Sequence, residues 1–212
     1  MAPRVLLAAL ALVLVLVPAA AAEIYPRPAD ARLLARAPSA EERLAESVGR
    51  RLTRLPVVVR CSTAAEAPGL LGVTPFLNDE PRGYFLLMPF VCRQLARFRA
   101  NPVAYDPAAC AGGPCVQQLS LMTQSLQTVA HESYHALGFE AEATAECYGM
   151  QSLWFVARTL GASVPQSEAL AAWYWRYQYP AWRLGNHTQY WSAQCRDGGR
   201  LDLRLRSHAW PS

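Results

Sequence analysis

Two histidines and a glutamate stand at a spacing that suits metal-assisted hydrolysis. The segment His131-Glu132-Ser133-Tyr134-His135 has the pattern HExxH. On a helix, residues four apart lie one above the other, so both imidazoles can reach one ion. Glu132 would then face a water on that ion and could take its proton. The pattern therefore predicts a zinc centre with Glu132 as general base.

A catalytic zinc ion takes three protein ligands and leaves one position for water. The candidates for the third ligand are acidic, because four of the sixteen acids of the chain lie between Glu132 and Glu146. Gly138 can reverse the chain, and Glu142 and Glu146 then share one face of the returning helix. If Glu142 binds the metal, Glu146 can accept the N–H of a ligand imidazole. A site closed by both glutamates would instead be structural.

The motif needs a helix, and hydrophobic periodicity predicts one over residues 116–137. Apolar residues recur there at offsets of three and four, and they should form one buried face. They are Leu119, Met122, Leu126, Val129, Ala130 and Leu137. His131 and His135 project with Gln124 and Thr128 away from that face, toward a cleft. Gly138 should end this helix.

The remaining patterns predict an α+β domain that is mostly helical and spans residues 39–212. Ser39 to Glu42 form a capping box for a helix over about 40–54. Residues 56–61 and 83–88 are expected to be strands, with a loop between them that contains Gly and Pro. Shorter helical signals cover 90–98, and further helices are expected over 141–160 and from Pro165 to before Pro180. The proline-bearing residues 23–38 favour an extended leader or linker.

The N-terminus and the cysteines indicate export. Residues 1–22 combine one arginine, an apolar run and a small-residue end, which is typical of a signal peptide; retention as a membrane anchor is the alternative. An even number of cysteines in an exported chain favours three disulfides, with 15 possible pairings. The only local prediction joins Cys110 to Cys115 across a flexible turn. The six cysteines are Cys61, Cys92, Cys110, Cys115, Cys147 and Cys195. A secreted or extracytoplasmic protein is expected.

The motif and the residues after it resemble the gluzincin branch of the zincin metallopeptidases. In that family HExxH is followed by a helix with an ExxA(D/E)-type motif, which Glu142-Ala143-Thr144-Ala145-Glu146 resembles. The resemblance covers about residues 126–151 and implies His131, His135 and Glu142 as zinc ligands, with Glu146 supporting a ligand histidine. The seven-residue spacing to Glu142 is shorter than in better-known gluzincins, so Glu146 and Glu140 stay open as ligands.

A wider likeness concerns the arrangement of the chain. A signal peptide, HExxHxxG, Glu-Cys-Tyr and a C-terminal Cys-x-x-Gly-Gly are similar to small exported bacterial proteins of zincin type, a likeness that brings no defined activity. A donor for the developing oxyanion should come from the aromatic C-terminal segment. The candidates are Tyr174, Tyr177, His187 and Tyr190.

The expected activity is amide hydrolysis on a peptide or protein substrate. The alternatives are a peptidoglycan-directed or other amide hydrolase, and a non-catalytic binding domain on a zincin scaffold. A net charge of +4 with scattered arginines argues against a nucleic-acid surface. No stable membrane insertion is expected once the signal is cleaved. The oligomeric state stays open.

Overall fold

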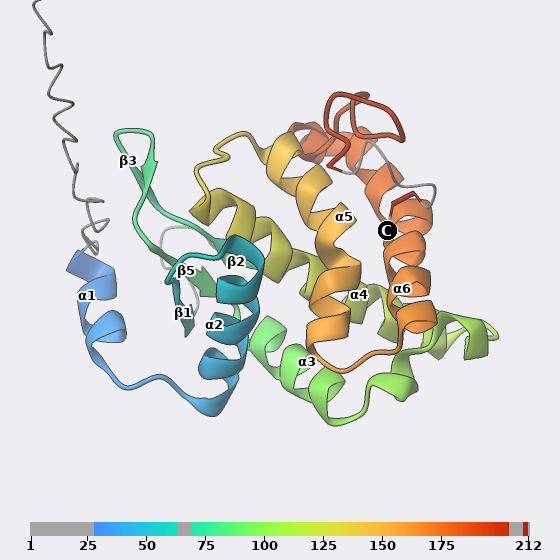
Figure 1. The fold of residues 1–212 in the computed structure, drawn as a ribbon, viewed down its shortest axis with the longest axis horizontal. Helices are drawn as coiled ribbons and strands as arrows, with labels where there is room; N and C mark the ends of the chain where they lie inside the picture. Colours follow the sequence, from blue (N-terminus) through green and yellow to red (C-terminus); the bar gives the residue numbers. More distant parts are fainter. Residues whose placement is uncertain (1–27, 63–68, 204–209, 212) are drawn as a thin grey trace, which may run out of the picture.

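The helix that carries the HExxH motif runs through the centre of the fold. This computed structural model describes residues 28–62, 69–203 and 210–211, so the expected signal peptide lies outside the described residues. The central helix, α4 (Pro114–Ala136), packs against α5 (Glu142–Thr159), α6 (Val164–Tyr177), α2 (Ala40–Thr53) and α3 (Pro89–Ala100) (Figure 1). The predicted α+β, mostly helical class is confirmed. Within the described part, no helix is long and apolar enough to cross a membrane.

A small mixed sheet packs against α2, α3 and α4. β1 (Val58–Cys61) pairs in parallel with the fully buried β5 (Tyr84–Leu87), and β2 (Gly72–Val73) pairs antiparallel with β5 at the edge. β3 (Phe76–Leu77) and β4 (Glu80–Pro81) form a hairpin that projects from the body of the molecule (Figure 1). The predicted strands are confirmed as β1 and β5, whereas β2 to β4 lie in the segment that was expected to be a loop.

Of the expected extended leader 23–38, residues 23–27 lie outside the described residues, and the part from 28 onward is largely helical instead of extended. Pro28–Ala35 form the helix α1, with proline at the first position, where its fixed φ suits a helix. The buried guanidinium of Arg60 on β1 donates hydrogen bonds to the carbonyl oxygens of Leu33, Leu34 and Arg36. Because these acceptors include the unpaired carbonyls at a helix end, Arg60 both caps α1 and attaches it to the sheet. That contact is tertiary, and local sequence patterns do not record it.

The chain after α4 reverses sharply and returns alongside it. Gly138 has φ of +93°, in the left-handed region that glycine adopts without steric cost. α5 then packs closely on α4 at Gly149, where a Cβ atom would lie 2.9 Å from the backbone nitrogen of His131. α6 follows, and the 3₁₀ helices η3 (Tyr179–Arg183) and η4 (Gly185–Tyr190) return the chain to the N-terminal side of α5. These elements enclose the motif.

Three disulfides fasten the periphery to this core. Cys110–Cys115 confirms the local prediction and closes the segment of η1 (Pro102–Tyr105) and η2 (Pro107–Ala109) onto the start of α4. Cys61–Cys92 joins β1 to α3, and Cys147–Cys195 joins α5 to the chain after η4. Disulfides of this kind persist in oxidising surroundings, so they fit an extracellular protein.

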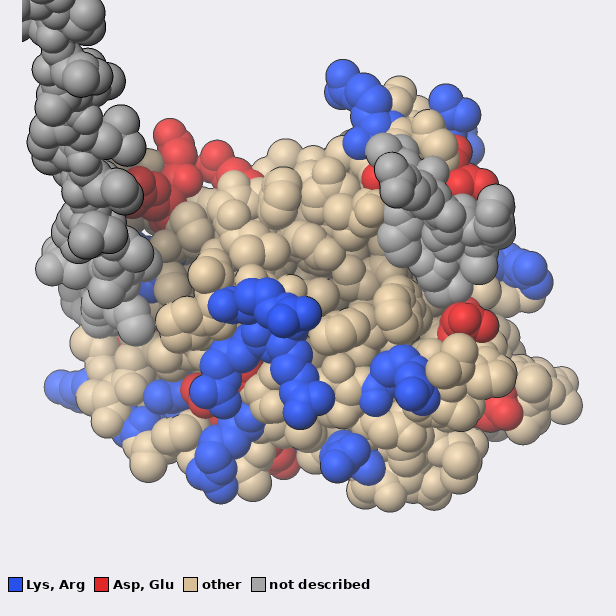
Figure 2. All heavy atoms as spheres, viewed as in Figure 1, with Lys and Arg blue, Asp and Glu red and all other residues tan. Residues whose placement is uncertain are grey.

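The surface charges are unevenly distributed. Figure 2 shows arginines gathered around α2 and few charges over α5.

Candidate metal and catalytic site

Three side-chain atoms from α4 and α5 converge on one point. The Nε2 atoms of His131 and His135 lie 2.9 Å apart. Oε2 of Glu142, the first residue of α5, lies 3.0 Å from Nε2 of His131 and 3.3 Å from Nε2 of His135. The two imidazoles are buried, while the Glu142 carboxylate is about two-fifths exposed. This donor set can hold a metal ion at the rim of a cleft.

The second nitrogen of each imidazole has its own acceptor. Nδ1 of His131 lies 3.1 Å from Oε2 of Glu146, and Nδ1 of His135 lies 2.6 Å from the backbone oxygen of Phe139. A ring nitrogen beside an obligate acceptor carries the proton, so both Nδ1 atoms donate. This tautomer leaves each Nε2 directed at Glu142 and able to bind a metal when unprotonated.

Glu146 is the most fully bonded carboxylate of the site. Its Oε1 accepts hydrogen bonds from Tyr174 Oη at 2.5 Å and from Trp182 Nε1 at 2.9 Å. Its Oε2 accepts from Gln127 Nε2 at 2.5 Å as well as from His131. With four donors from α4, α6 and η3, the buried Glu146 orients His131 and is directed away from the triangle of Nε2 and Oε2 atoms. Among the alternatives that the spacing left open, Glu142 is therefore the glutamate that faces both Nε2 atoms.

Glu132 lies beside the donor set but points at the edge strand β2. Its Oε2 accepts a hydrogen bond of 2.8 Å from Thr74 Oγ1, which follows β2 in the chain. Gly72 on β2 lies so close that a Cβ atom there would stand 2.6 Å from Oε1 of Glu132. Burial raises the pKa of Glu132, although His131, His135 and Thr74 act in the opposite direction. The carboxylate is thus placed and tuned to accept a proton.

His131 and Glu142 compensate each other's charge. Burial alone would lower the pKa of His131, but its hydrogen bonds with Glu142 and Glu146 raise the pKa to about 10. Burial would raise the pKa of Glu142, and its hydrogen bonds with both imidazoles lower the pKa to about 2. The pair is therefore a charged His131–Glu142 contact in the protein without a metal.

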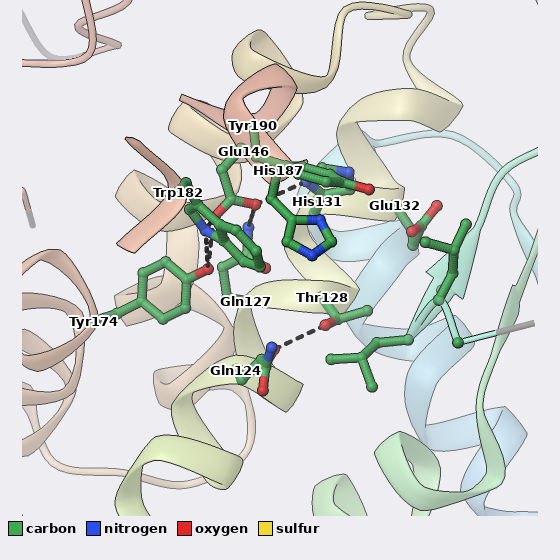
Figure 3. A pocket seen from close by; sticks show the side chains of 14 residues that line it. Gln124, Gln127, Thr128, His131, Glu132, Glu146, Tyr174, Trp182, His187 and Tyr190 are labelled. Atoms are coloured by element: carbon green, nitrogen blue, oxygen red, sulfur yellow. Dashed lines mark hydrogen bonds and ion pairs between the residues drawn. The ribbon is translucent and has the colours of Figure 1, made fainter. Parts of the chain in front are cut away.

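A cleft runs past the motif as two adjoining cavities. One, of about 230 Å³, extends along α4 toward α6 and η3 and includes Gln124, Gln127, Thr128 and Trp182 in its lining (Figure 3). The other, of about 250 Å³, extends toward the β3–β4 hairpin and the turn before α5. The two cavities share five lining residues, which are Leu70, Gly72, His131, Glu132 and Tyr190. We call them the α4 lobe and the hairpin lobe; the motif lies where they meet.

The four candidate oxyanion donors have different places in the structure. Tyr190 lines both lobes, its ring centre 5.8 Å from that of His131, and His187 lines the α4 lobe. Tyr174 lines the α4 lobe, but its hydroxyl donates to Glu146. Tyr177 is 57% exposed, its ring packs against that of Trp173 at an angle of 50°, and it does not line the cleft. Burial, together with nearby carboxylates, raises the pKa of Tyr190 to about 12, which keeps its hydroxyl protonated.

Sequence reasoning missed three residues that position the site. Gly72 and Thr74 contact Glu132 from a segment without periodicity, and no pattern in the sequence connects them to the motif 58 residues later. Trp182 belongs to the aromatic segment, but only the fold shows that its indole donates to Glu146. Helical spacing did place Gln124 and Thr128 correctly, because both line the α4 lobe with His131.

Comparisons with known proteins leave the site to be interpreted from its own geometry. No family model, no curated protein and no solved structure matches this chain.

Proposed function

We propose that this protein is an exported zinc-dependent peptidase of gluzincin-like pattern. The observation that carries the proposal is the triangle of His131 Nε2, His135 Nε2 and Glu142 Oε2, with the unliganded carboxylate of Glu132 beside it. A purely structural metal site has no use for a buried, uncoordinated carboxylate next to its ligands. The three disulfides and the apolar N-terminal run support export.

The spacing of the donor atoms fits zinc. Ligand atoms about 2.0–2.1 Å from a tetrahedral zinc ion stand about 3.3 Å from one another. The three separations in the structure, 2.9, 3.0 and 3.3 Å, are close to that value. Two imidazoles and one carboxylate also form a donor set typical of catalytic zinc, with a fourth position left for water. Bound there, zinc would polarise a substrate carbonyl and lower the pKa of its water toward about 7.

The residues of the chain would divide the remaining work. Glu132, buried and held by Thr74, takes a proton from the attacking water and passes it to the leaving amine. Tyr190 lines the cleft close to His131 and keeps its proton at neutral pH, so its hydroxyl can donate to the developing oxyanion. Glu146 acts through His131, because it contacts the ring of that ligand and not the substrate.

A peptide is the amide substrate that the cleft favours. β2 is an edge strand, and its Gly72 lines both lobes beside the motif. An extended peptide can pair with such an edge through its main chain, independent of its side chains. A peptide bound along β2 would cross the motif and place one amide bond between Glu132 and Tyr190.

Elemental analysis of the purified, disulfide-intact protein tests the metal site. We expect about one zinc per chain, lost in Glu142→Ala and retained in Glu140→Ala, whose carboxylate is exposed in the hairpin lobe. Peptide hydrolysis should cease in Glu132→Gln while zinc remains bound. Folded wild-type protein without zinc, or Glu132→Gln with wild-type turnover, would refute the proposal.

A further inference from the structure

The α4 lobe contains a buried amide whose acceptor atom has no partner among the residues that the structure describes. Gln127 is only 3% exposed, and its Nε2 donates to Oε2 of Glu146. Because a carboxylate only accepts, this bond fixes which end of the amide is nitrogen. The opposite atom, Oε1, has no hydrogen-bond partner among the described residues. Gln127 Oε1 is not one of the solvent-sealed polar atoms without a partner in the described part of the chain, and its side chain lines a cavity. The open space that Gln127 lines is the α4 lobe (Figure 3).

Two neighbours on α4 extend this polar surface. Gln124 and Thr128 lie three residues before and one residue after Gln127, and both line the same lobe. Thr128 Oγ1 donates to the backbone oxygen of Gln124, so its lone pairs remain to accept. The side-chain amide of Gln124 makes no hydrogen bond within the described part of the chain, so it offers both a donor and an acceptor.

Around Gln127 the lobe is walled by apolar side chains and by a carboxylate that is already fully bonded. Leu70, Leu71 and the ring of Trp182 supply its walls. Two buried carboxylates line the lobe: Glu146 has all four of its hydrogen bonds made by protein donors, and Glu132, where the two lobes meet, accepts from Thr74. At the Gln127 end of the lobe a cation would lose its hydration without gaining an unpaired carboxylate, because Glu146 is fully bonded there, and an anion would meet the acceptor of Gln127.

We infer that the α4 lobe is the specificity subsite of the proposed peptidase and that it selects a substrate residue with a side-chain carboxamide, glutamine or asparagine. The amide N–H group of such a residue can donate to Gln127 Oε1, and its oxygen can accept from Gln124. An apolar residue of equal size would leave Gln127 Oε1 dehydrated and unpaired. An unmet buried hydrogen bond costs about 1–3 kcal/mol, or roughly 5- to 150-fold in discrimination.

The inference rests on the proposed function, and two measurements separate them. In the first, wild-type protein cleaves a random peptide mixture, and the cut sites are identified by mass spectrometry. We expect glutamine and asparagine to exceed leucine, methionine and glutamate at one position beside the cleaved bond by roughly tenfold. Gln124→Leu should reduce that preference, whereas Gln117→Leu, an exposed glutamine on the same helix, should not. Cleavage with an apolar or charged preference at both neighbouring positions would overturn the inference.

The second measurement needs no turnover. Zinc-treated Glu132→Gln protein is titrated with N-acetyl-glutaminamide and with N-acetyl-methioninamide, and binding is followed by NMR at the side-chain amides of the protein. We expect the glutamine derivative to bind roughly fivefold more tightly or better, with Gln124→Leu removing the difference. Equal affinities, or tighter binding of the methionine derivative, would refute the subsite even where hydrolysis occurs. Selective glutamine binding in a protein that cleaves nothing would retain the subsite and reject the peptidase.

Discussion

The hydroxyl of Thr74 and the carboxylate of Glu132 are joined by a 2.8 Å hydrogen bond between segments 58 residues apart. It ties the proposed base to the chain just after β2. We expect Thr74→Val to retain zinc and to lower kcat roughly tenfold with little change in KM, since a bond to a charged group contributes about 1.5–3 kcal/mol. Thr74→Ser should restore the rate because it restores the donor. Equal kcat in Thr74→Val and wild type would show that the bond does not position the base.

A substitution at Gly72 tests how closely β2 packs against the side chain of Glu132. A Cβ at this position would lie 2.6 Å from Oε1 and 2.7 Å from Cγ of Glu132, so Gly72→Ala should destabilise the fold by about 1–3 kcal/mol. The clash needs the Glu132 side chain. Gly72→Ala should therefore cost much less in a Glu132→Ala background, as measured by denaturant unfolding of the four proteins in the cycle. An equal cost in both backgrounds would place the strain elsewhere.

Sequence patterns correctly predicted the elements that are determined by residues close together in the chain. The capping box at Ser39 begins α2 as expected, and the left-handed Gly138 ends the turn after α4. The positions of His131 and Thr128 on one face of α4 followed from helical spacing alone. Each of these features depends on residues within about one or two helical turns, and the sequence carries that information directly.

The features that were missed depend on distant partners. α1 forms where prolines favoured an extended chain, because Arg60 binds its terminal carbonyls. Thr74 has no unusual neighbours in the sequence, and its role arises only when β2 pairs with β5 beside α4. Two of the three disulfides likewise join residues 31 and 48 positions apart, which no spacing rule selects.

The Cys147–Cys195 disulfide should contribute more stability than Cys110–Cys115. It closes a separation of 48 residues rather than 5, and the loop-entropy relation gives about 4 against about 2 kcal/mol. Cys147 also follows Glu146 directly, so the bond helps to hold the proposed second ligand-bearing helix. We expect the double variant Cys147→Ala/Cys195→Ala to unfold at lower denaturant concentration than Cys110→Ala/Cys115→Ala. The reverse order would mean that local strain or residual structure outweighs loop entropy.

Glu42 should make stability depend on pH in the acid range. Burial opposes its ionisation, but hydrogen bonds from Arg36, Cys61 N and Ser39 N lower its pKa to about 2. Because this pKa lies below the unfolded value near 4.5, the stabilisation is complete above that value and is lost as pH falls toward about 2. We expect Glu42→Gln to be on the order of 1–2 kcal/mol less stable at pH 7, a modest value because Arg36 is partly exposed.

Unfolding measured at pH 7 and pH 3 checks this prediction. The gap between wild type and Glu42→Gln should narrow at pH 3. Glu41→Gln removes the neighbouring carboxylate, which makes no ion pair with a described residue, and it should leave the pH dependence unchanged. A gap that stays constant between the two pH values would assign the role of Glu42 to packing instead of charge.

Tyr174 and Tyr177 lie three residues apart on α6 and form a matched pair for testing how Glu146 supports the metal. Tyr174 Oη donates to Glu146 at 2.5 Å and is fully buried, while Tyr177 is 57% exposed and does not line the cleft. Removing a bond that orients a ligand histidine commonly weakens metal binding about 10- to 100-fold. We expect that loss in Tyr174→Phe, by chelator competition, and wild-type zinc affinity in Tyr177→Phe. If Tyr174→Phe binds zinc as wild type does, then Gln127 and Trp182 suffice to hold Glu146 against His131.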